Sequence, residues 1–191
     1  MAEFIARVGP LPDRPAEGDP FTSLARAIVF QQLAGRAAAA IYRRLLESIG
    51  GKMKAEALLG RTPEELRAVG LSNNKTAALV DLATKTDDGT VPLAELAGLS
   101  DDEIVERLVV VRGIGRWTAE MFLLFELRRP DVWPADDLGV RNGYSLIHDL
   151  PEMITPRALA AAGDVYRPFR STAALYCWQA VHESRGTSPI R

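Results

Sequence analysis

Helix-start signals recur along this chain of 191 residues, and they constrain its fold more than any other feature. Thr62-Pro63-Glu64-Glu65 and Ser100-Asp101-Asp102-Glu103 both have the pattern of a capping box, in which a hydroxyl and a later carboxylate satisfy the first N–H groups of a helix. Asp19-Pro20 and Thr155-Pro156 place proline at a first helical position. No stretch shows the sustained alternation of a strand. We therefore expect an all-α protein of about eight to ten short helices.

Apolar residues at helical spacing predict where several of these helices lie. We expect helices over residues 20–30 and 35–48, a helix capped by Ser72, and a last long helix from Pro168 through Val181. Residues 1–20 are expected to form an irregular arm or a short helix.

Composition limits the class of protein. The chain is 47% hydrophobic and 25% charged, as in soluble globular proteins, and it has neither an apolar run long enough to cross a bilayer nor a secretion signal, so we expect it in the cytoplasm. Cys177 is the single cysteine, which excludes an internal disulfide and an iron–sulfur cluster held by four cysteines. His148 and His182 are far apart in the sequence and are not expected to bind a metal.

The net charge of −2 and a pI near 5.8 do not indicate a nucleic-acid partner. The charges are nevertheless segregated, because residues 35–54 are mainly basic while residues 87–103 are mainly acidic. Arg43 and Arg44 have two open interpretations: they belong to a surface that holds DNA, or they are an ordinary solvated helix face.

The segment Arg112-Gly113-Ile114-Gly115 has the pattern of a tight hairpin between two apolar helices. Its glycines allow positive φ and close backbone approach, Ile114 can point into the core, and the next helix begins with free N–H groups that attract a phosphate. Arg112, Gly113, Gly115, Arg116 and Thr118 are the candidate phosphate-binding residues. The alternative is a plain helix connection, since these also use glycine.

Four motifs in order resemble those of the helix-hairpin-helix DNA glycosylases, and within them the 3-methyladenine DNA glycosylase II branch. The motifs are Gln31-Gln32 with Gly70-Leu71-Ser72-x-x-Lys75, residues 108–119, Trp133-Pro134-Ala135-Asp136-Asp137-Leu138-Gly139, and Tyr166-Arg167-Pro168-Phe169-Arg170-Ser171 with Trp178. The resemblance covers residues 21–183. It implies a single catalytic unit over residues 1–191 with two all-helical lobes: residues 33–132, ending in the helix-hairpin-helix, and residues 1–32 plus 133–191. The damaged base would enter the cleft between them.

Asp137 resembles the catalytic aspartate of this family. Breaking an N-glycosidic bond gives the sugar oxocarbenium character, which a fixed carboxylate near the anomeric carbon stabilises. A helix N-terminus favours an ionised carboxylate, which suits electrostatic stabilisation or activation of water. Asp136 is the neighbouring alternative, with the simpler role of a helix cap.

Trp117 stands where lyase-competent relatives have a nucleophilic lysine. A tryptophan cannot form a Schiff base, so we expect a monofunctional enzyme with water as the nucleophile. Trp117 and Trp178 are also candidates to stack on a positively charged alkylated base, although core packing is the simpler role for both. Met121 and Leu138 complete the expected base pocket, where other members of the branch have aromatic residues.

Gln32 resembles the side chain that fills the gap left by a flipped base, and Leu33 is the expected apolar wedge beside it. The simpler alternative is that Gln31 and Gln32 end the first helix, and Gln31 is expected to be structural. The resemblance also implies a structural Na⁺ or K⁺ at the backbone carbonyls of Val109, Val111 and Ile114.

These residues together predict a monofunctional DNA glycosylase. It would excise alkylated bases of the 3-methyladenine and 7-methylguanine type from double-stranded DNA and leave an abasic site, with no cofactor in the chemistry, no membrane partner and a monomeric state. Two alternatives stay open: the same fold acting on uracil, hypoxanthine or etheno bases, or a non-catalytic helix-hairpin-helix module that only binds DNA. The second has no use for Asp137.

Overall fold

The computed structural model describes residues 1–12 and 19–186, and every regular element in them is helical. The expected all-α fold is confirmed. In chain order the α-helices are α1 (Ala2–Val8), α2 (Pro20–Phe30), α3 (Gly35–Ser48), α4 (Ala55–Leu59), α5 (Pro63–Ala68), α6 (Asn73–Asp87), α7 (Asp101–Val109), α8 (Arg116–Phe125), α9 (Leu138–Ile147), α10 (Pro156–Ala162) and α11 (Arg170–Ser184), with short 3₁₀ turns at Leu96–Gly98 and Gly163–Tyr166.

The helix-start signals read from the sequence function as predicted. Thr62 and Ser100 each form both bonds of a capping box, and the Ser72 hydroxyl accepts from the N–H of Lys75 at the start of α6. Helices α2 and α3 have the predicted bounds. The last helix begins at Arg170, two residues after Pro168, and the five-residue helix α4 was not predicted.

The chain divides into two compact units. One contains Met1–Ala16 and Leu123–Arg191, and the other contains Glu17–Phe122, so the boundary falls within α8. This division differs from the lobes of residues 33–132 and 1–32 plus 133–191 that the sequence suggested. The physical reason is the apolar face of α2, where Leu24 and Ile28 are fully buried as α2 packs against α3 and α6.

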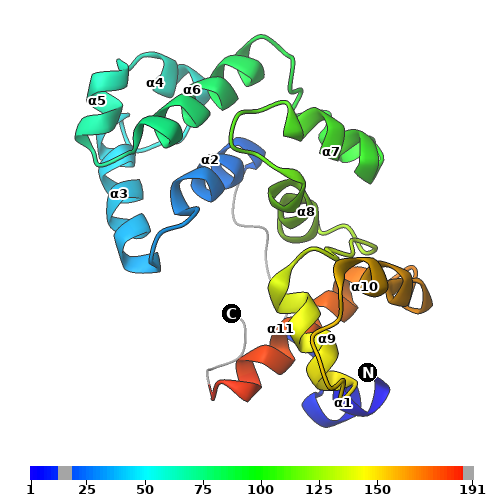
Figure 1. The fold of residues 1–191 in the computed structure, drawn as a ribbon. Helices are drawn as coiled ribbons and strands as arrows, with labels where there is room; N and C mark the ends of the chain where they lie inside the picture. Colours follow the sequence, from blue (N-terminus) through cyan, green and yellow to red (C-terminus); the bar gives the residue numbers. More distant parts are fainter. Residues whose placement is uncertain (13–18, 187–191) are drawn as a thin grey trace. The chain divides into compact units, whose positions relative to one another are not determined.

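Helix α6 is the centre of the unit formed by residues 17–122. It packs against α2, α4 and α5, and it runs alongside these helices in Figure 1. Leu79 and Leu82 on α6 are fully buried, as are Leu58 on α4 and Leu66 on α5. The short helices therefore gain their stability from a shared apolar core rather than from their length.

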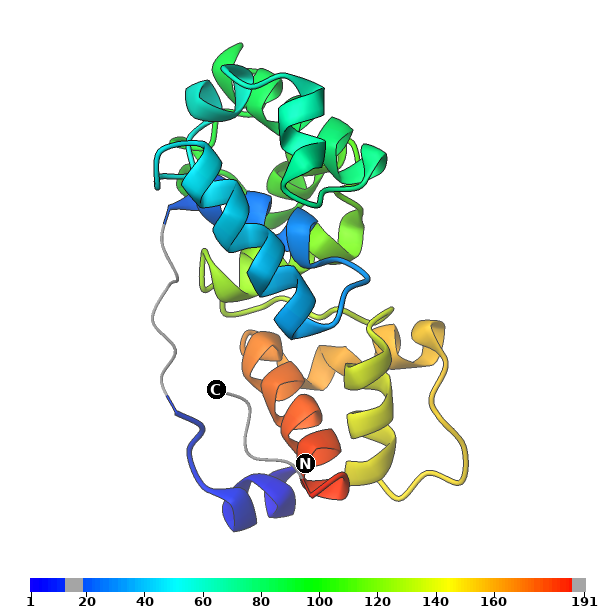
Figure 2. The same ribbon diagram turned by 90° about the vertical axis from the view of Figure 1, so that its left-hand side faces the viewer.

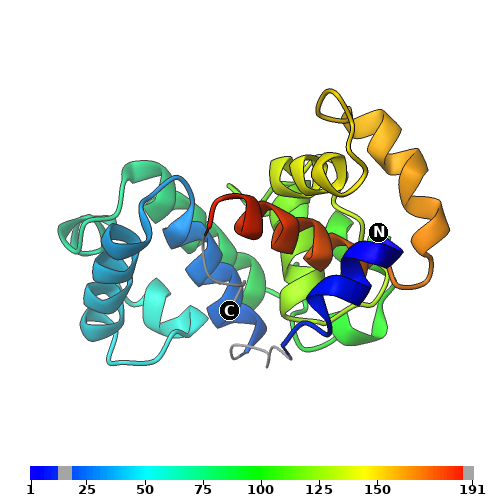
Figure 3. The ribbon, with the colours of Figure 1, turned by 90° about the horizontal axis from the view of Figure 1, so that it is seen from below.

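Helices α9 and α11 form the main packing pair of the other unit and lie side by side in Figure 2. Helix α1 lies beside α11, as Figure 3 shows. There the ring of Phe4 packs edge-on against Tyr176, and the Tyr176 hydroxyl donates a 2.9 Å hydrogen bond to the carbonyl of Gly9. Arg7 also pairs with Glu183 at 2.8 Å. The N-terminal segment is thus packed against, and hydrogen-bonded to, the C-terminal helix α11.

The crossing of α9 and α11 requires a glycine. A Cβ atom added to Gly143 would overlap the backbone carbonyl of Cys177, so only hydrogen fits between the two helices. Cys177 is itself fully buried, and burial raises the pKa of its thiol to about 12. The thiol is a packing group rather than a reactive one.

Candidate active site and DNA-binding hairpin

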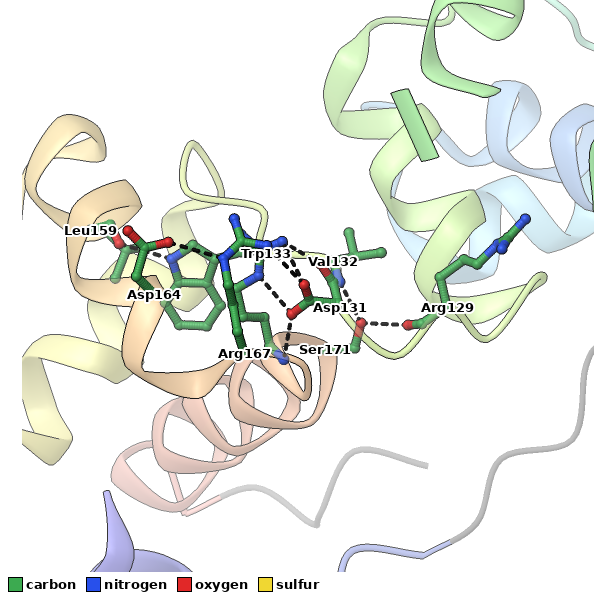
Figure 4. Close-up of polar contacts among 9 residues, drawn as sticks. Arg129, Asp131, Val132, Trp133, Leu159, Asp164, Arg167 and Ser171 are labelled. Atoms are coloured by element: carbon green, nitrogen blue, oxygen red, sulfur yellow. Dashed lines mark hydrogen bonds and ion pairs between the residues drawn. The ribbon is translucent and has the colours of Figure 1, made fainter. Parts of the chain in front are cut away.

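Asp131 forms hydrogen bonds that hold in place the segment preceding the candidate catalytic residue, Asp137. Its Oδ1 accepts from Arg170 Nε at 2.7 Å, and its Oδ2 accepts from Arg170 Nη2 at 2.9 Å. Its Oδ2 also accepts from Arg167 Nη1 at 3.0 Å (Figure 4). These hydrogen bonds, with Arg170 the strongest partner, lower the pKa of Asp131. The bidentate contact between the Arg170 guanidinium and the Asp131 carboxylate is directional, and it holds residue 131 against the start of α11.

Ser171 and Trp133 complete this attachment. The Ser171 hydroxyl donates to the carbonyl of Arg129 at 2.5 Å and accepts from the N–H of Val132 at 2.9 Å (Figure 4). The buried indole of Trp133 donates to the carbonyl of Leu159 at 2.8 Å. Residues 129–133 are thereby fixed to α10 and α11 four residues before Asp137.

Asp137 is the N-cap of α9. Its Oδ1 accepts a 2.7 Å hydrogen bond from the N–H of Val140 and a 2.8 Å hydrogen bond from the indole Nε1 of Trp178 on α11. The helix N-terminus adds favourable partial charge for the carboxylate. Asp136 is exposed. Asp137 is therefore the carboxylate whose orientation is set by two donors from two helices.

Trp178 has a role that the sequence did not reveal. In addition to its bond with Asp137, its ring stacks on Phe125 with centroids 5.7 Å apart and planes inclined by 26°. A Cβ on Gly139 would lie only 2.6 Å from indole Cδ1 and 2.7 Å from Nε1. The missing side chain at Gly139 is what lets the indole reach Asp137.

A cavity of about 480 Å³ is lined by Trp178 and by the two residues that follow Asp137 in the sequence, and its lining lies wholly within the unit that contains α9 and α11. It is lined by Leu138, Gly139, Asn142, Met153, Trp178, Val181, His182 and Arg185. The volume is in the range of small-molecule sites in proteins. The structure thus brings together Asp137 and two predicted base-pocket residues, Trp178 and the exposed Leu138.

The two other predicted base-pocket residues, Trp117 and Met121, lie on α8 within residues 17–122. The side chain of Trp117 is 47% exposed, so core packing, the alternative considered from sequence, does not describe it. Met121 is half-buried one helical turn further on.

The hairpin between α7 and α8 has the expected geometry at Gly113 and Ile114. Gly113 has a φ of 78°, in the left-handed region that favours glycine, and Ile114 is buried. The N–H of Arg112 donates to Oδ2 of Asp81 at 2.7 Å, which ties the turn to α6. Within the described residues, the N–H groups of Gly113 and Gly115 donate to no protein group. Backbone N–H groups without a protein acceptor before a helix can bind an anion.

The other phosphate-binding candidates differ in their surroundings. Gly115 has no positive φ and has open space where a Cβ would lie, so the turn does not require glycine there. The side chain of Thr118 is buried, and its hydroxyl accepts a 3.5 Å hydrogen bond from Gln31 Nε2. Arg116 Nε donates to Glu120 at 3.0 Å, so its charge is already partly compensated.

Gln32 and Leu33 lie in the turn after α2, and both are exposed. Gln32 has a φ of 55°, an uncommon backbone conformation for a residue with a side chain. Gln31 is structural, as expected, because its amide donates to the carbonyl of Gly113 at 2.9 Å. The turn and the hairpin are therefore directly bonded.

The carbonyl groups of Val109, Val111 and Ile114 suit a monovalent cation by their chemistry. In the described part of the chain the carbonyls of Val109 and Ile114 accept no hydrogen bond, while that of Val111 accepts from the N–H of Ile114. Neutral carbonyl oxygens at the end of a helix fit Na⁺ or K⁺, which need no carboxylate ligand. No group of three or more His, Cys, Asp or Glu side chains in the described residues is arranged to hold a metal.

Residues 25–168 match the family model described as HhH-GPD superfamily base excision DNA repair protein. The chain belongs to the HhH-GPD superfamily of base excision DNA repair proteins.

Its relatives identify the branch within that superfamily. The chain is 40% identical to DNA-3-methyladenine glycosylase 1 of Schizosaccharomyces pombe over 94% of this chain and 81% of that protein. It is 28% identical to DNA-3-methyladenine glycosylase 2 of Escherichia coli over 84% of this chain but 57% of that protein. The resemblance inferred from the four motifs is confirmed.

Two solved structures of 3-methyladenine DNA glycosylases have the same fold as this chain. The S. pombe 3-methyladenine DNA glycosylase in complex with abasic DNA superposes with a TM-score of 0.81 at 39% identity, covering 93% of this chain and 89% of that one. A DNA-3-methyladenine glycosidase from Bacillus halodurans superposes with a TM-score of 0.90 at 33% identity, covering 97% and 86%. The helix-hairpin-helix glycosylase fold expected from sequence is confirmed.

Proposed function

We propose that this protein is a monofunctional DNA glycosylase that excises alkylated bases, of the 3-methyladenine and 7-methylguanine type, from double-stranded DNA and leaves an abasic site. The observation that carries the proposal is the Asp137 carboxylate, capped into α9 by Val140 and bonded to Trp178 beside a cavity of about 480 Å³. The names of the relatives with 40% and 28% identity support the same substrate class.

In this proposal Asp137 acts on the sugar of the flipped nucleotide. As the N-glycosidic bond breaks, positive charge develops on the sugar, and a carboxylate held by fixed donors stabilises it without having to reorient. The same carboxylate is suited to take a proton from the attacking water. The nucleotide would enter the cavity beside Asp137, where Leu138 and Trp178 offer apolar surface.

Trp117 supports the reaction class. Its exposed indole has no nucleophilic nitrogen, so the sugar would be attacked by water and no covalent enzyme–DNA intermediate would form. An electron-rich ring also attracts a cationic base, by about 0.5 to 2 kcal/mol.

The hairpin would hold the DNA backbone. The N–H groups of Gly113 and Gly115 would bind a phosphate at the start of α8, and the carbonyls of Val109, Val111 and Ile114 would hold a structural Na⁺ or K⁺ that supports the turn. Gln32 would enter the duplex where the base has left it, with Leu33 beside it. The partner is thus double-stranded DNA bound by a monomer in the cytoplasm, at the nucleoid. No helix in the described residues is long and apolar enough to cross a membrane.

A panel of duplexes with one lesion each tests the proposal. The protein should release 3-methyladenine and 7-methylguanine, and Asp137→Asn should release neither. Release of uracil, hypoxanthine or etheno bases in their place would assign the same site to another lesion. Salt-dependent DNA binding with no base release from any duplex would instead identify a non-catalytic DNA-binding module.

A further inference from the structure

Lys75 occupies a position in α6 that helix electrostatics does not explain. It is the third residue of α6, next to the positive end of the helix dipole, where a cation is disfavoured. The side chain is half-buried, and this burial lowers the pKa of Lys75. A desolvated ammonium at the wrong end of its own helix needs compensation from another element.

Helix α2 supplies that compensation. The Lys75 ammonium donates to the carbonyl of Val29 at 2.5 Å and to the carbonyl of Gln31 at 2.8 Å. Carbonyl groups at a helix C-terminus lack helical partners and carry partial negative charge, so the ammonium caps α2 from outside. These two bonds fix the backbone immediately before Gln32.

The same turn is bonded to the hairpin. Gln31, whose carbonyl Lys75 holds, uses its side-chain amide to donate to the carbonyl of Gly113 at 2.9 Å. Gln32 follows with a φ of 55°, a conformation that persists only where the surrounding contacts enforce it. Lys75, Gln31 and Gly113 thus form one chain of bonds around Gln32.

We propose that Lys75 is a positioning residue that presents Gln32 to the DNA in a fixed geometry relative to the hairpin. The ammonium does not touch the DNA. It acts by holding the turn at residues 31–32, so that Gln32 enters the duplex without first having to be ordered. This inference rests on the proposed function only in assuming that Gln32 fills the gap left by a flipped nucleotide.

The test compares binding to a duplex with a tetrahydrofuran abasic site and to the undamaged duplex, at a temperature where circular dichroism shows each variant folded. A 2-aminopurine next to the abasic site reports local unstacking by its fluorescence. Lys75→Met should lower the preference for the abasic duplex by about tenfold and reduce the fluorescence rise, as should Gln32→Ala. The double variant should lose no more than either single variant, because both changes remove one function. Lys75→Arg should keep the preference within about twofold, since it retains donors for both carbonyls.

Lys52→Met is the matched control, because Lys52 is exposed and also carries one positive charge; its preference should be unchanged. If Lys75→Met does not fold, Gln31→Met tests the same chain of bonds at Gly113 and should also lower the preference. Full preference in folded Lys75→Met, or additive losses in the double variant, would overturn the inference. So would a wild-type chain without preference for the abasic duplex. A wild-type chain that shows the expected pattern but releases no base would support this inference while overturning the proposed reaction.

Discussion

The indole N–H of Trp178 donates a 2.8 Å hydrogen bond to Oδ1 of Asp137, although 41 residues separate them in the sequence. The bond joins the N-cap residue of α9 to the middle of α11, and the N–H of Val140 donates to the same oxygen. The orientation of the carboxylate is therefore set by tertiary packing as well as by the local helix cap.

Trp178→Phe removes the donor and keeps an aromatic ring beside Phe125. Base release should slow by about tenfold in single-turnover assays, because one hydrogen bond to a charged group is lost. Affinity for undamaged DNA should be unchanged. Phe125→Leu, which removes the ring stacking but keeps the bond, should have a smaller effect. An unaltered rate in Trp178→Phe would show that the orientation of Asp137 does not depend on the indole of Trp178.

Asp137→Asn and Asp137→Ala separate catalysis from folding. Both should slow base release by about 10³-fold or more, since neither offers a carboxylate to the developing charge. Asparagine caps helices as well as aspartate does, so only Asp137→Ala should lose stability, by about 1 kcal/mol in urea unfolding. Asp136→Asn is the control, with expected full activity. Substantial base release by Asp137→Asn would exclude Asp137 as the catalytic group.

Gly139→Ala tests the close approach of Trp178. The added Cβ would overlap the indole, so we expect a loss of about 1 to 3 kcal/mol in the free energy of unfolding together with slower base release. Gly35→Ala is a matched control, because a Cβ there meets nothing within 4 Å. A Gly139→Ala variant as stable and active as the wild type would show that the indole has another position from which to serve Asp137.

Borohydride reduction tests the chemical consequence of Trp117. With no lysine at this place in α8, the protein should form no covalent adduct with DNA during base release, because no Schiff base is available to reduce. Denaturing gel electrophoresis of the reaction with labelled duplex is the measurement, with a lyase-competent glycosylase as the positive control. A trapped protein–DNA species that depends on Asp137 would contradict the hydrolytic mechanism.

Asp131→Asn should reveal a pH-dependent part of the stability. Because Arg170 lowers the pKa of Asp131 in the folded state, the ionised form is favoured by folding. The resulting stability is complete above the unfolded value of about 3.9 and is lost as the pH falls through the lower folded value. Asp131→Asn should therefore be less stable than the wild type by about 1 to 3 kcal/mol at pH 7, and urea unfolding should show this difference narrowing below about pH 4.

Asp164→Asn is the control for that comparison. Asp164 also pairs with Arg167, but its side chain is 68% exposed, so its loss should cost less than about 1 kcal/mol. A constant difference between wild type and Asp131→Asn from pH 3 to pH 7 would rule out the titration of Asp131 as its source.

Local signals made much of the fold predictable. Each capping box, at Thr62 and at Ser100, involves only four consecutive residues, so it can be recognised from sequence. The two boxes correctly predict the starts of α5 and α7. The motif around Asp137 likewise indicates a cap at the start of α9. The bond from Trp178 to Asp137 was not predictable in this way, because it depends on how α9 and α11 pack and on the space left by Gly139.

The bounds of the two compact units were not predictable from sequence for a related reason. The sequence of α2 does not indicate which helices its apolar face contacts. In the structure α2, with its buried residues Leu24 and Ile28, packs against α3 and α6, and it therefore belongs to the unit of residues 17–122. Similarly, the sequence placed Lys75 in a motif but contained no sign that its ammonium reaches Val29 and Gln31.

The glycine crossing at Gly143 also limits how this protein can be re-engineered. Because the Cys177 carbonyl occupies the space of a side chain at Gly143, any larger residue there would force α9 away from α11, so libraries that vary these two helices should leave Gly143 unchanged. Under the proposed function, attempts to change the range of excised bases are better directed to Leu138 and Met153, which line the cavity and are exposed.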